Sequence, residues 1–178
     1  DHFKKCRQRD VELNMRTQRE LMSRTEDVWP NLLTEEKLDR LHAKLREKII
    51  GQDFAIHKVI DTLRRVRHNI EDQINSGKID EKPLAYFFFA GPTGVGKTEV
   101  ARILCEELKG IAHRKINMTE YSQEHAVMRL LGAPPSYRGD PKGELGQFLI
   151  DNPASIILFD EFEKAHEKTW QNFLTMLE

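Results

Sequence analysis

The chain has 178 residues, of which 39% are hydrophobic and 32% are charged, and its formal net charge is −1. This length is enough for one domain with a sizeable core plus an extension, while the near-zero charge argues against nucleic-acid or membrane binding through bulk electrostatics. No apolar run approaches the roughly 20 residues that a membrane-spanning helix needs. The two cysteines, Cys6 and Cys105, lie far apart without metal-ligand spacing, so a reducing, cytoplasmic compartment is the expectation.

Residues 1–24 are rich in Lys, Arg and Gln and show only a weak helical pattern. A solvated helix or linker is the first interpretation, and a basic nucleic-acid arm is the alternative. Thr34 is an expected helix N-cap, followed by two glutamates in the first turn. Two helices are predicted from apolar residues at helical spacing, separated by Gly51. Their apolar faces comprise Leu38, Leu41 and Leu45, then Ile56, Val59, Ile60, Leu63, Val66 and Ile70.

The hydrophobic period then changes in a way that indicates strands. Residues 84–90, LAYFFFA, form a nearly continuous apolar run, which predicts a strand buried on both faces as in a parallel sheet. Residues 114–117 and 154–159 are two further expected strands. Helices are predicted after the glycine-rich residues 91–98, at 122–131, at about 143–151 and from about 163, the last with Phe173 and Leu174 facing inward. Strands that alternate with helices predict an α/β fold around a parallel sheet.

GPTGVGKT, residues 91–98, follows the pattern G-x-x-x-x-G-K-[ST] at every fixed position, between an expected strand and an expected helix. Glycines let backbone N–H groups approach phosphates closely, and the positive N-terminus of the following helix is aimed at the same anion. Lys97 is expected to reach the β- and γ-phosphates, and Thr98 to offer its hydroxyl to Mg²⁺. A nucleotide site is therefore predicted here rather than a chance glycine turn.

Asp160 and Glu161 directly follow the apolar run 154–159. In phosphate-loop enzymes, an aspartate at such a strand end helps to hold Mg²⁺, and an adjacent glutamate can polarise the attacking water as a general base. Acidic residues at a strand end are common, so the pair gains its weight from the phosphate loop. Asn117 and Glu120 follow another expected strand and either face the site or act in a turn or cap.

Four segments occur in an order that resembles the second ATPase module of Clp-type AAA+ proteins, a family of ring-forming unfoldases and disaggregases. They are IIGQ, GPTGVGKTE, INMTEYSQEHAVMRLLGAPPSY and ILFDEFEKAH. The resemblance covers roughly residues 26–178. It implies a P-loop fold with three layers, α/β/α, around a parallel sheet. It also implies a nucleotide-binding large subdomain over residues 31–178 and a basic N-terminal extension over residues 1–30.

The resemblance implies ATP and Mg²⁺ as cofactors, with the phosphate loop as Walker A and the acidic pair as Walker B. Ile49 and Ile50 would flank the adenine. The residues placed at the nucleotide are Ile49, Ile50, Gly91, Pro92, Thr93, Gly94, Val95, Gly96, Lys97, Thr98 and Glu99. Glu161 and Lys97 would be catalytic, and the metal would be held by Thr98 and Asp160.

Tyr137 and Arg138, in the segment GAPPSYRG, would belong to the pore loop that grips a protein substrate in the central channel of a homo-hexamer. The family usually has a glycine before this aromatic residue and an aliphatic residue after it, whereas this chain has Ser136 and Arg138. The family's sensor residues, arginine finger and lid follow the position of Glu178. The chain is therefore expected to be an incomplete module that hydrolyses ATP poorly by itself.

The leading function is an ATP-driven protein unfoldase or disaggregase. One alternative is an AAA+ remodeller dedicated to one secretion or transport complex, which the unusual residues beside Tyr137 favour. Another is a nucleic-acid-linked AAA+ ATPase, against which the near-zero net charge argues. A non-catalytic, nucleotide-gated scaffold is disfavoured because both the phosphate loop and the acidic pair are intact.

Overall fold

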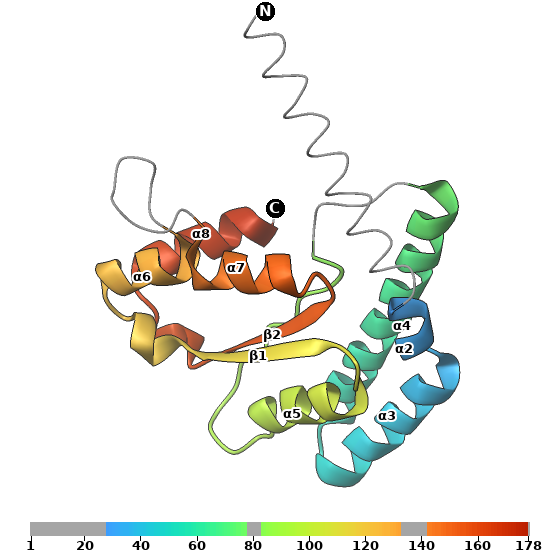
Figure 1. The fold of residues 1–178 in the computed structure, drawn as a ribbon. Helices are drawn as coiled ribbons and strands as arrows, with labels where there is room; N and C mark the ends of the chain where they lie inside the picture. Colours follow the sequence, from blue (N-terminus) through green and yellow to red (C-terminus); the bar gives the residue numbers. More distant parts are fainter. Residues whose placement is uncertain (1–27, 78–82, 133–141, 178) are drawn as a thin grey trace, which may run out of the picture.

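The computed structural model describes residues 28–77, 83–132 and 142–177, with side chains as far as Leu174. Within these residues, helices precede, connect and follow two strands, and η1 and η2 are short 3₁₀ helices (Figure 1). The elements are α2 Trp29–Leu32, α3 Glu35–Lys48, α4 Asp53–Ser76, α5 Lys97–Glu107, β1 Ala112–Asn117, η1 Met118–Tyr121, α6 Glu124–Leu131, α7 Gly143–Asp151, β2 Ser155–Asp160, η2 Phe162–Lys164 and α8 Glu167–Leu177. Among the described residues, no helix combines the length and apolar character needed to cross a membrane.

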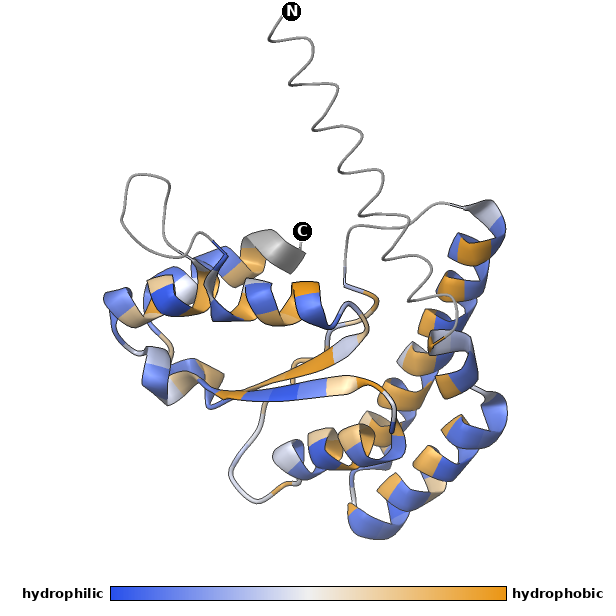
Figure 2. Cartoon of the chain, in the orientation of Figure 1, coloured by the Kyte–Doolittle hydropathy of each residue, from blue (hydrophilic) through white to orange (hydrophobic). Residues whose placement is uncertain are grey.

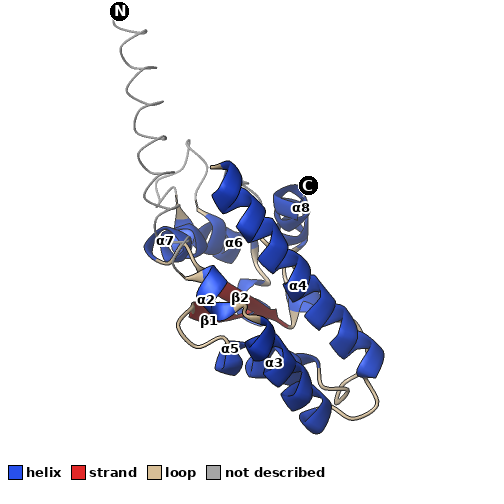
Figure 3. Cartoon of the chain, turned by 90° about the vertical axis from the view of Figure 1, so that its right-hand side faces the viewer, coloured by secondary structure: helices blue, strands red, loops and turns tan. Residues whose placement is uncertain are grey.

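The two strands form a parallel pair in which Ala112 lies opposite Ser155 and Asn117 lies opposite Asp160. Parallel strands need a long crossover connection, and here it runs through α6 and α7. Helices cover both faces of the pair: α5, backed by α3 and α4, lies on one side, and α6, α7 and α8 lie on the other (Figures 1 and 3). The predicted α/β layering around parallel strands is confirmed for the described residues.

The first core lies between α3, α4 and α5 and also includes α2. It forms because apolar residues at helical spacing share one face of each helix, and Figure 2 shows such an orange stripe along α4 on the side turned toward the rest of the molecule. Every residue predicted for the apolar faces of α3 and α4 is buried. Thr34 caps α3 as predicted, because its hydroxyl accepts a hydrogen bond from the backbone N–H of Lys37 at 3.4 Å.

The second core lies on the other face of the sheet, under α6, α7 and α8. Its aromatic centre is Phe159 of β2, whose ring centroid lies 4.5 Å from that of Phe173 in α8. Successive residues of a strand point to opposite faces. Accordingly, Ile157 and Phe159 pack into this core, whereas Ile156 packs into the first one. The strands therefore hold two separate apolar clusters together.

Residues 84–90 differ from their prediction. They are not paired with the described strands, and Tyr86 and Phe88 are 63% and 73% exposed. Phe87 and Phe89 stack with centroids 6.1 Å apart and pack against the first core. A strand is buried on both faces only where neighbouring strands pair with it and layers cover both sides. Neither β1 nor β2 pairs with this segment, so the prediction of a doubly buried strand is wrong for the described structure.

The predicted helix ends agree with the structure to within a few residues. The last helix begins at Glu167 rather than at about residue 163, because residues Phe162–Lys164 form η2 instead. Leu174, predicted to face inward, is 60% exposed. It follows the buried Phe173 by one residue, which corresponds to a rotation of about 100° around the helix axis. The inward orientation predicted for Leu174 is therefore wrong.

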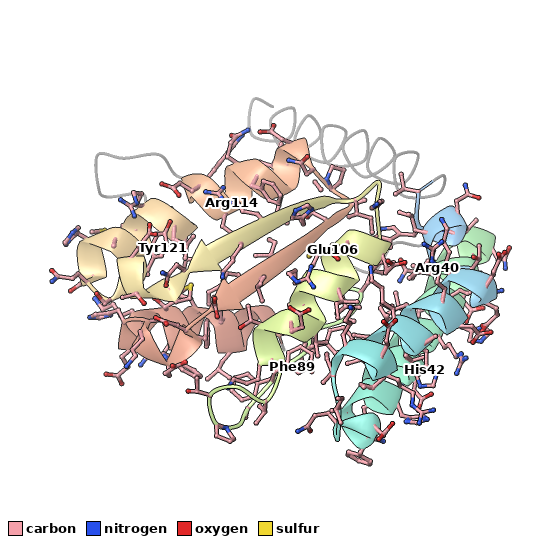
Figure 4. All side chains as sticks on the ribbon, turned by 90° about the horizontal axis from the view of Figure 1, so that it is seen from below. Arg40, His42, Phe89, Glu106, Arg114 and Tyr121 are labelled. Carbon is pink, nitrogen blue, oxygen red and sulfur yellow. The ribbon has the colours of Figure 1, made fainter. Side chains whose placement is uncertain are left out.

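Ion pairs join α3 to α5 at the surface, where Arg40 and Glu106 are labelled in Figure 4. Lys44 Nζ lies 2.6 Å from Glu107 Oε1, and Arg40 Nε lies 3.4 Å from Glu107 Oε2. The hydrogen bond from Lys44 lowers the pKa of the Glu107 carboxyl. Ion pairs at a protein surface add little to stability, because water screens the charges and the long side chains lose conformational freedom. The buried apolar contacts beneath them therefore supply most of the energy that holds α3 on α5.

Candidate nucleotide site

The phosphate loop, residues 91–96, is a turn between the extended segment 83–90 and the start of α5. Gly96 is the N-cap of α5 and has a φ of 96°, a left-handed conformation that favours glycine. A Cβ at Gly96 would lie 3.2 Å from Cγ2 of Ile49, so glycine also allows the loop to pack closely against the end of α3. The loop leads directly into a helix N-terminus, where the helix dipole favours an anion.

Lys97 is the first residue of α5, and its ammonium group lies over the loop. Nζ donates hydrogen bonds to the backbone oxygens of Gly91 and Pro92, each at 2.7 Å. A lysine has three donors, so one more remains for a phosphate oxygen. Glu99 points instead to Arg102, whose Nε donates to it at 2.8 Å and lowers its pKa.

The two predicted adenine contacts differ in exposure. Ile49 is buried and lies beside Gly96 of the phosphate loop. Ile50 is 90% exposed. An apolar side chain left in water can offer contact area to a nucleobase. The structure thus brings Ile49 to the loop, and it leaves Ile50 free on the surface.

Asp160 is the last residue of β2, and its side chain is 28% exposed. Because side chains alternate along a strand, Asp160 lies on the same face as Ile156, which is the face covered by α5. Its Oδ2 lies 2.6 Å from Nζ of Lys115, and its Oδ1 accepts a hydrogen bond from the backbone N–H of Glu161 at 3.2 Å. Both carboxylate oxygens are therefore engaged by charged or polar groups of the protein.

Glu161 is the only non-glycine residue with a positive φ among the described residues, at 52°. A non-glycine residue in the left-handed region carries a cost on the order of 1 kcal/mol, and such residues gather at functional sites. Its Oε2 accepts a hydrogen bond from Oγ1 of Thr119 at 2.6 Å. Thr119 is itself fixed by Asn117, whose Oδ1 accepts from the backbone N–H of Thr119 at 3.1 Å. Of the two roles considered for Asn117, the structure shows the cap.

The groups predicted for phosphate and metal lie at the same end of the molecule. Figure 1 shows the carboxyl ends of β1 and β2 and the N-terminal end of α5 on one side, and α5 packs against β2. The Thr98 hydroxyl and the Asp160 carboxylate both supply oxygen, the donor atom that Mg²⁺ prefers. The residues present therefore fit a magnesium ion bound together with nucleotide phosphates.

A second group of interactions lies on the opposite face of the strands, at the base of the predicted pore loop. Gly132 and Gly143 flank residues 133–142, and a Cβ on Gly143 would lie 2.3 Å from the backbone nitrogen of Gly132. The two ends of this segment are thus in direct contact. Tyr137 and Arg138 themselves lie outside the described residues.

Glu144 joins this loop base to β1 and α6. Its Oε2 accepts hydrogen bonds from Arg114 Nη2 and the Tyr121 hydroxyl, each at 3.1 Å, and its Oε1 lies 3.3 Å from Arg129 Nε. Figure 4 labels Arg114 and Tyr121 on this side of the strands. Arg129 also lies over the Tyr121 ring, 5.1 Å from its centroid. We call Arg114, Tyr121, Arg129 and Glu144 the Glu144 cluster.

Sequence reasoning missed Lys115, Thr119 and the Glu144 cluster. Lys115 and Thr119 contact acidic residues more than 40 positions away in the chain, and these contacts arise from the pairing of β1 with β2. One signal was available. In a strand, Lys115 and Asn117 share a face, and this face ends beside the acidic pair when the two strands are neighbours.

This arrangement is that of a P-loop α/β fold: parallel strands between helical layers, a glycine-rich loop before a helix, and an acidic pair after a strand. A family model described as "AAA domain (Cdc48 subfamily)" matches residues 82–178. The match covers more than half of the chain, and the chain belongs to this AAA family.

The chain is also similar to curated Clp proteins. It is 44% identical over 146 residues to the chaperone protein ClpB of Clostridium perfringens, covering 80% of this chain and 16% of that protein. It is 41% identical over 145 residues to ClpE, the ATP-binding subunit of an ATP-dependent Clp protease of Bacillus subtilis, covering 80% and 20%. The corresponding ClpC subunit of Staphylococcus aureus is 42% identical over 146 residues, covering 80% and 17%. The chain spans a fifth or less of the length of these relatives.

Proposed function

We propose that this chain is the ATP-binding and hydrolysing part of a Clp-like AAA+ protein, corresponding to the large subdomain of a second ATPase module. The observation that carries the proposal is that the phosphate loop and Asp160 lie on the same side of the sheet. The loop opens α5, and Asp160 lies on the sheet face that α5 covers. Family membership and the similarity to Clp proteins support ATP as the nucleotide.

In this proposal, each residue has a defined task. The backbone of residues 91–96 and the N-terminus of α5 bind the phosphates, and Lys97 donates to them with the hydrogen that its two loop hydrogen bonds leave over. Thr98 and Asp160 hold Mg²⁺, which neutralises the charge that develops on the phosphates. Glu161 accepts a proton from the attacking water, and Thr119 orients its carboxylate. Ile49 and Ile50 contact the adenine.

The test is nucleotide binding by Lys97→Ala. Removing a charged hydrogen-bond donor from a phosphate should weaken ATP binding roughly tenfold to a hundredfold. Binding is measured with a fluorescent ATP analogue in the intact protein. Lys109→Ala is the matched control, because Lys109 is an exposed lysine after the far end of α5. Equal binding by Lys97→Ala and the control would reject this site.

We further propose that the intact protein assembles into a ring, as a homo-hexamer, and uses Tyr137 to thread polypeptide substrates. The names of the relatives support protein substrates, since one is a chaperone and two are subunits of a protease. A remodeller dedicated to one partner complex is the second candidate. The observation that favours it is Arg138, which places a positive charge directly beside the proposed gripping ring.

A further inference from the structure

Each charged group of the candidate site already has a partner within the protein. Lys97 donates to two loop carbonyls, Glu161 accepts from Thr119, and Asp160 is paired with Lys115. The last of these pairs differs from the others, because it brings a full positive charge to a proposed metal ligand. Lys115 has no task in the proposed reaction.

The position of Lys115 follows from the register of the strands. Asn117 lies opposite Asp160, and Lys115 lies two residues earlier on the same face of β1. Its side chain extends along that face and brings Nζ to 2.6 Å from Asp160 Oδ2. The other oxygen, Oδ1, is engaged by the backbone N–H of Glu161. Oδ2 is therefore the atom of this carboxylate that a cation reaches, and the Lys115 ammonium holds it.

We propose that Lys115 is an internal counter-ion that competes with Mg²⁺ for Asp160, so that it sets the Mg²⁺ concentration at which the nucleotide site fills. This inference rests on the proposed function. An ammonium and a divalent cation repel each other strongly within a few ångströms, so they do not occupy Oδ2 together. Binding of the metal therefore requires the ammonium to leave.

The geometry permits this exchange. The Lys115 side chain is 55% exposed, so its ammonium can swing into water without the cost of burying a charge elsewhere. Exposed ion pairs are weak, and breaking one changes an equilibrium by about two- to fivefold. The pair is thus strong enough to occupy Asp160 when the metal is absent and weak enough to yield to it.

The experiment is a Mg²⁺ titration of nucleotide binding in the intact protein, with a fluorescent, non-hydrolysable ATP analogue held at fixed concentration. For Lys115→Gln, we expect half-maximal binding at a Mg²⁺ concentration about two- to fivefold lower than in the parent protein. Lys115→Arg keeps the positive charge and should behave like the parent. Lys168→Gln is the matched control, because Lys168 of α8 forms an ion pair with Glu124 of α6 and its side chain is 56% exposed.

Two results would overturn the inference while leaving the proposed function standing. One is an unchanged Mg²⁺ midpoint in Lys115→Gln. The other is a Mg²⁺ midpoint that moves to higher concentration in Lys115→Gln, which would make Lys115 a contact that helps nucleotide binding instead of a competitor of the metal. If the parent protein binds no nucleotide at any Mg²⁺ concentration, the proposed function fails and the inference fails with it.

Discussion

At the scale of single residues, the backbone at Glu161 is the most informative feature. Glu161 adopts a left-handed conformation that costs energy, and its carboxylate is held by Thr119. Glu161 is exposed, so neither its backbone conformation nor its hydrogen bond with Thr119 adds to the apolar cores. A strained and oriented carboxylate that directly follows a proposed metal ligand suits a general base, for which orientation matters more than stability.

The corresponding prediction concerns Glu161→Gln in the intact protein. An amide cannot accept the proton of the attacking water, so ATP turnover should fall by about 10²- to 10⁴-fold. Nucleotide binding should be retained, because the substitution keeps the size of the side chain and its hydrogen bond with Thr119. Phosphate release measures turnover, and a fluorescent ATP analogue measures binding. Undiminished turnover would remove Glu161 from the mechanism.

Sequence reasoning at this scale relies on spacing along the chain that encodes chemistry. Lys97 and Thr98 belong to a motif of eight consecutive residues, and Asp160 directly follows an apolar run. The partners of these residues were not predictable in the same way. The contact of Lys115 with Asp160 depends on which strands pair and in what register, and a single sequence does not encode this register locally.

At the scale of elements, the helices followed from their apolar periodicity, because a face buried against one neighbour leaves a clear pattern. The segment 84–90 did not, because a continuous apolar run predicts two buried faces. In the structure its residues alternate: Phe87 and Phe89 pack against the first core, while Tyr86 and Phe88 are exposed. Pairing of strands, rather than composition, decides whether such a run lies inside a sheet.

The loop base gives a prediction for Gly143→Ala. Gly143 has a φ of 66°, and an added Cβ would lie 2.3 Å from Gly132 N. The substitution should lower the free energy of unfolding by about 2–4 kcal/mol, because backbone strain and overpacking add together. Thermal unfolding measures this loss.

Gly146→Ala is the control in the same helix. The nearest atom to its added Cβ is 3.6 Å away, on Lys142, and alanine is the better helix former by about 1 kcal/mol. This variant should be as stable as the parent protein or slightly more stable. If Gly143→Ala also unfolded at the parent temperature, the close contact of Gly132 with Gly143 would be wrong.

At the scale of the whole molecule, the two strands separate the proposed nucleotide site from the base of the predicted pore loop. Lys115, Asn117 and Asp160 lie on the face toward α5 and the phosphate loop. Arg114, on the opposite face of β1, holds Glu144 at the base of the predicted pore loop. The layered fold was predictable from alternating strands and helices, but this division was not, because it depends on which way each strand residue points once the strands pair.

This division leads to the last prediction, on Tyr137→Ala. If nucleotide chemistry occurs on one face and substrate is gripped by the loop anchored on the other, removing the ring should abolish the processing of an unfolded protein and leave ATP turnover largely intact. A fluorescently labelled unfolded polypeptide reports processing, and phosphate release reports turnover. Tyr137→Phe keeps the aromatic ring and should keep activity. Arg138→Val introduces the aliphatic residue that is usual at this position in the Clp-type family. If this variant processes a broader range of polypeptides than the parent protein, the charge beside the ring limits which polypeptides are processed. Full processing by Tyr137→Ala would reject threading by this residue, because no other change has been made to the loop.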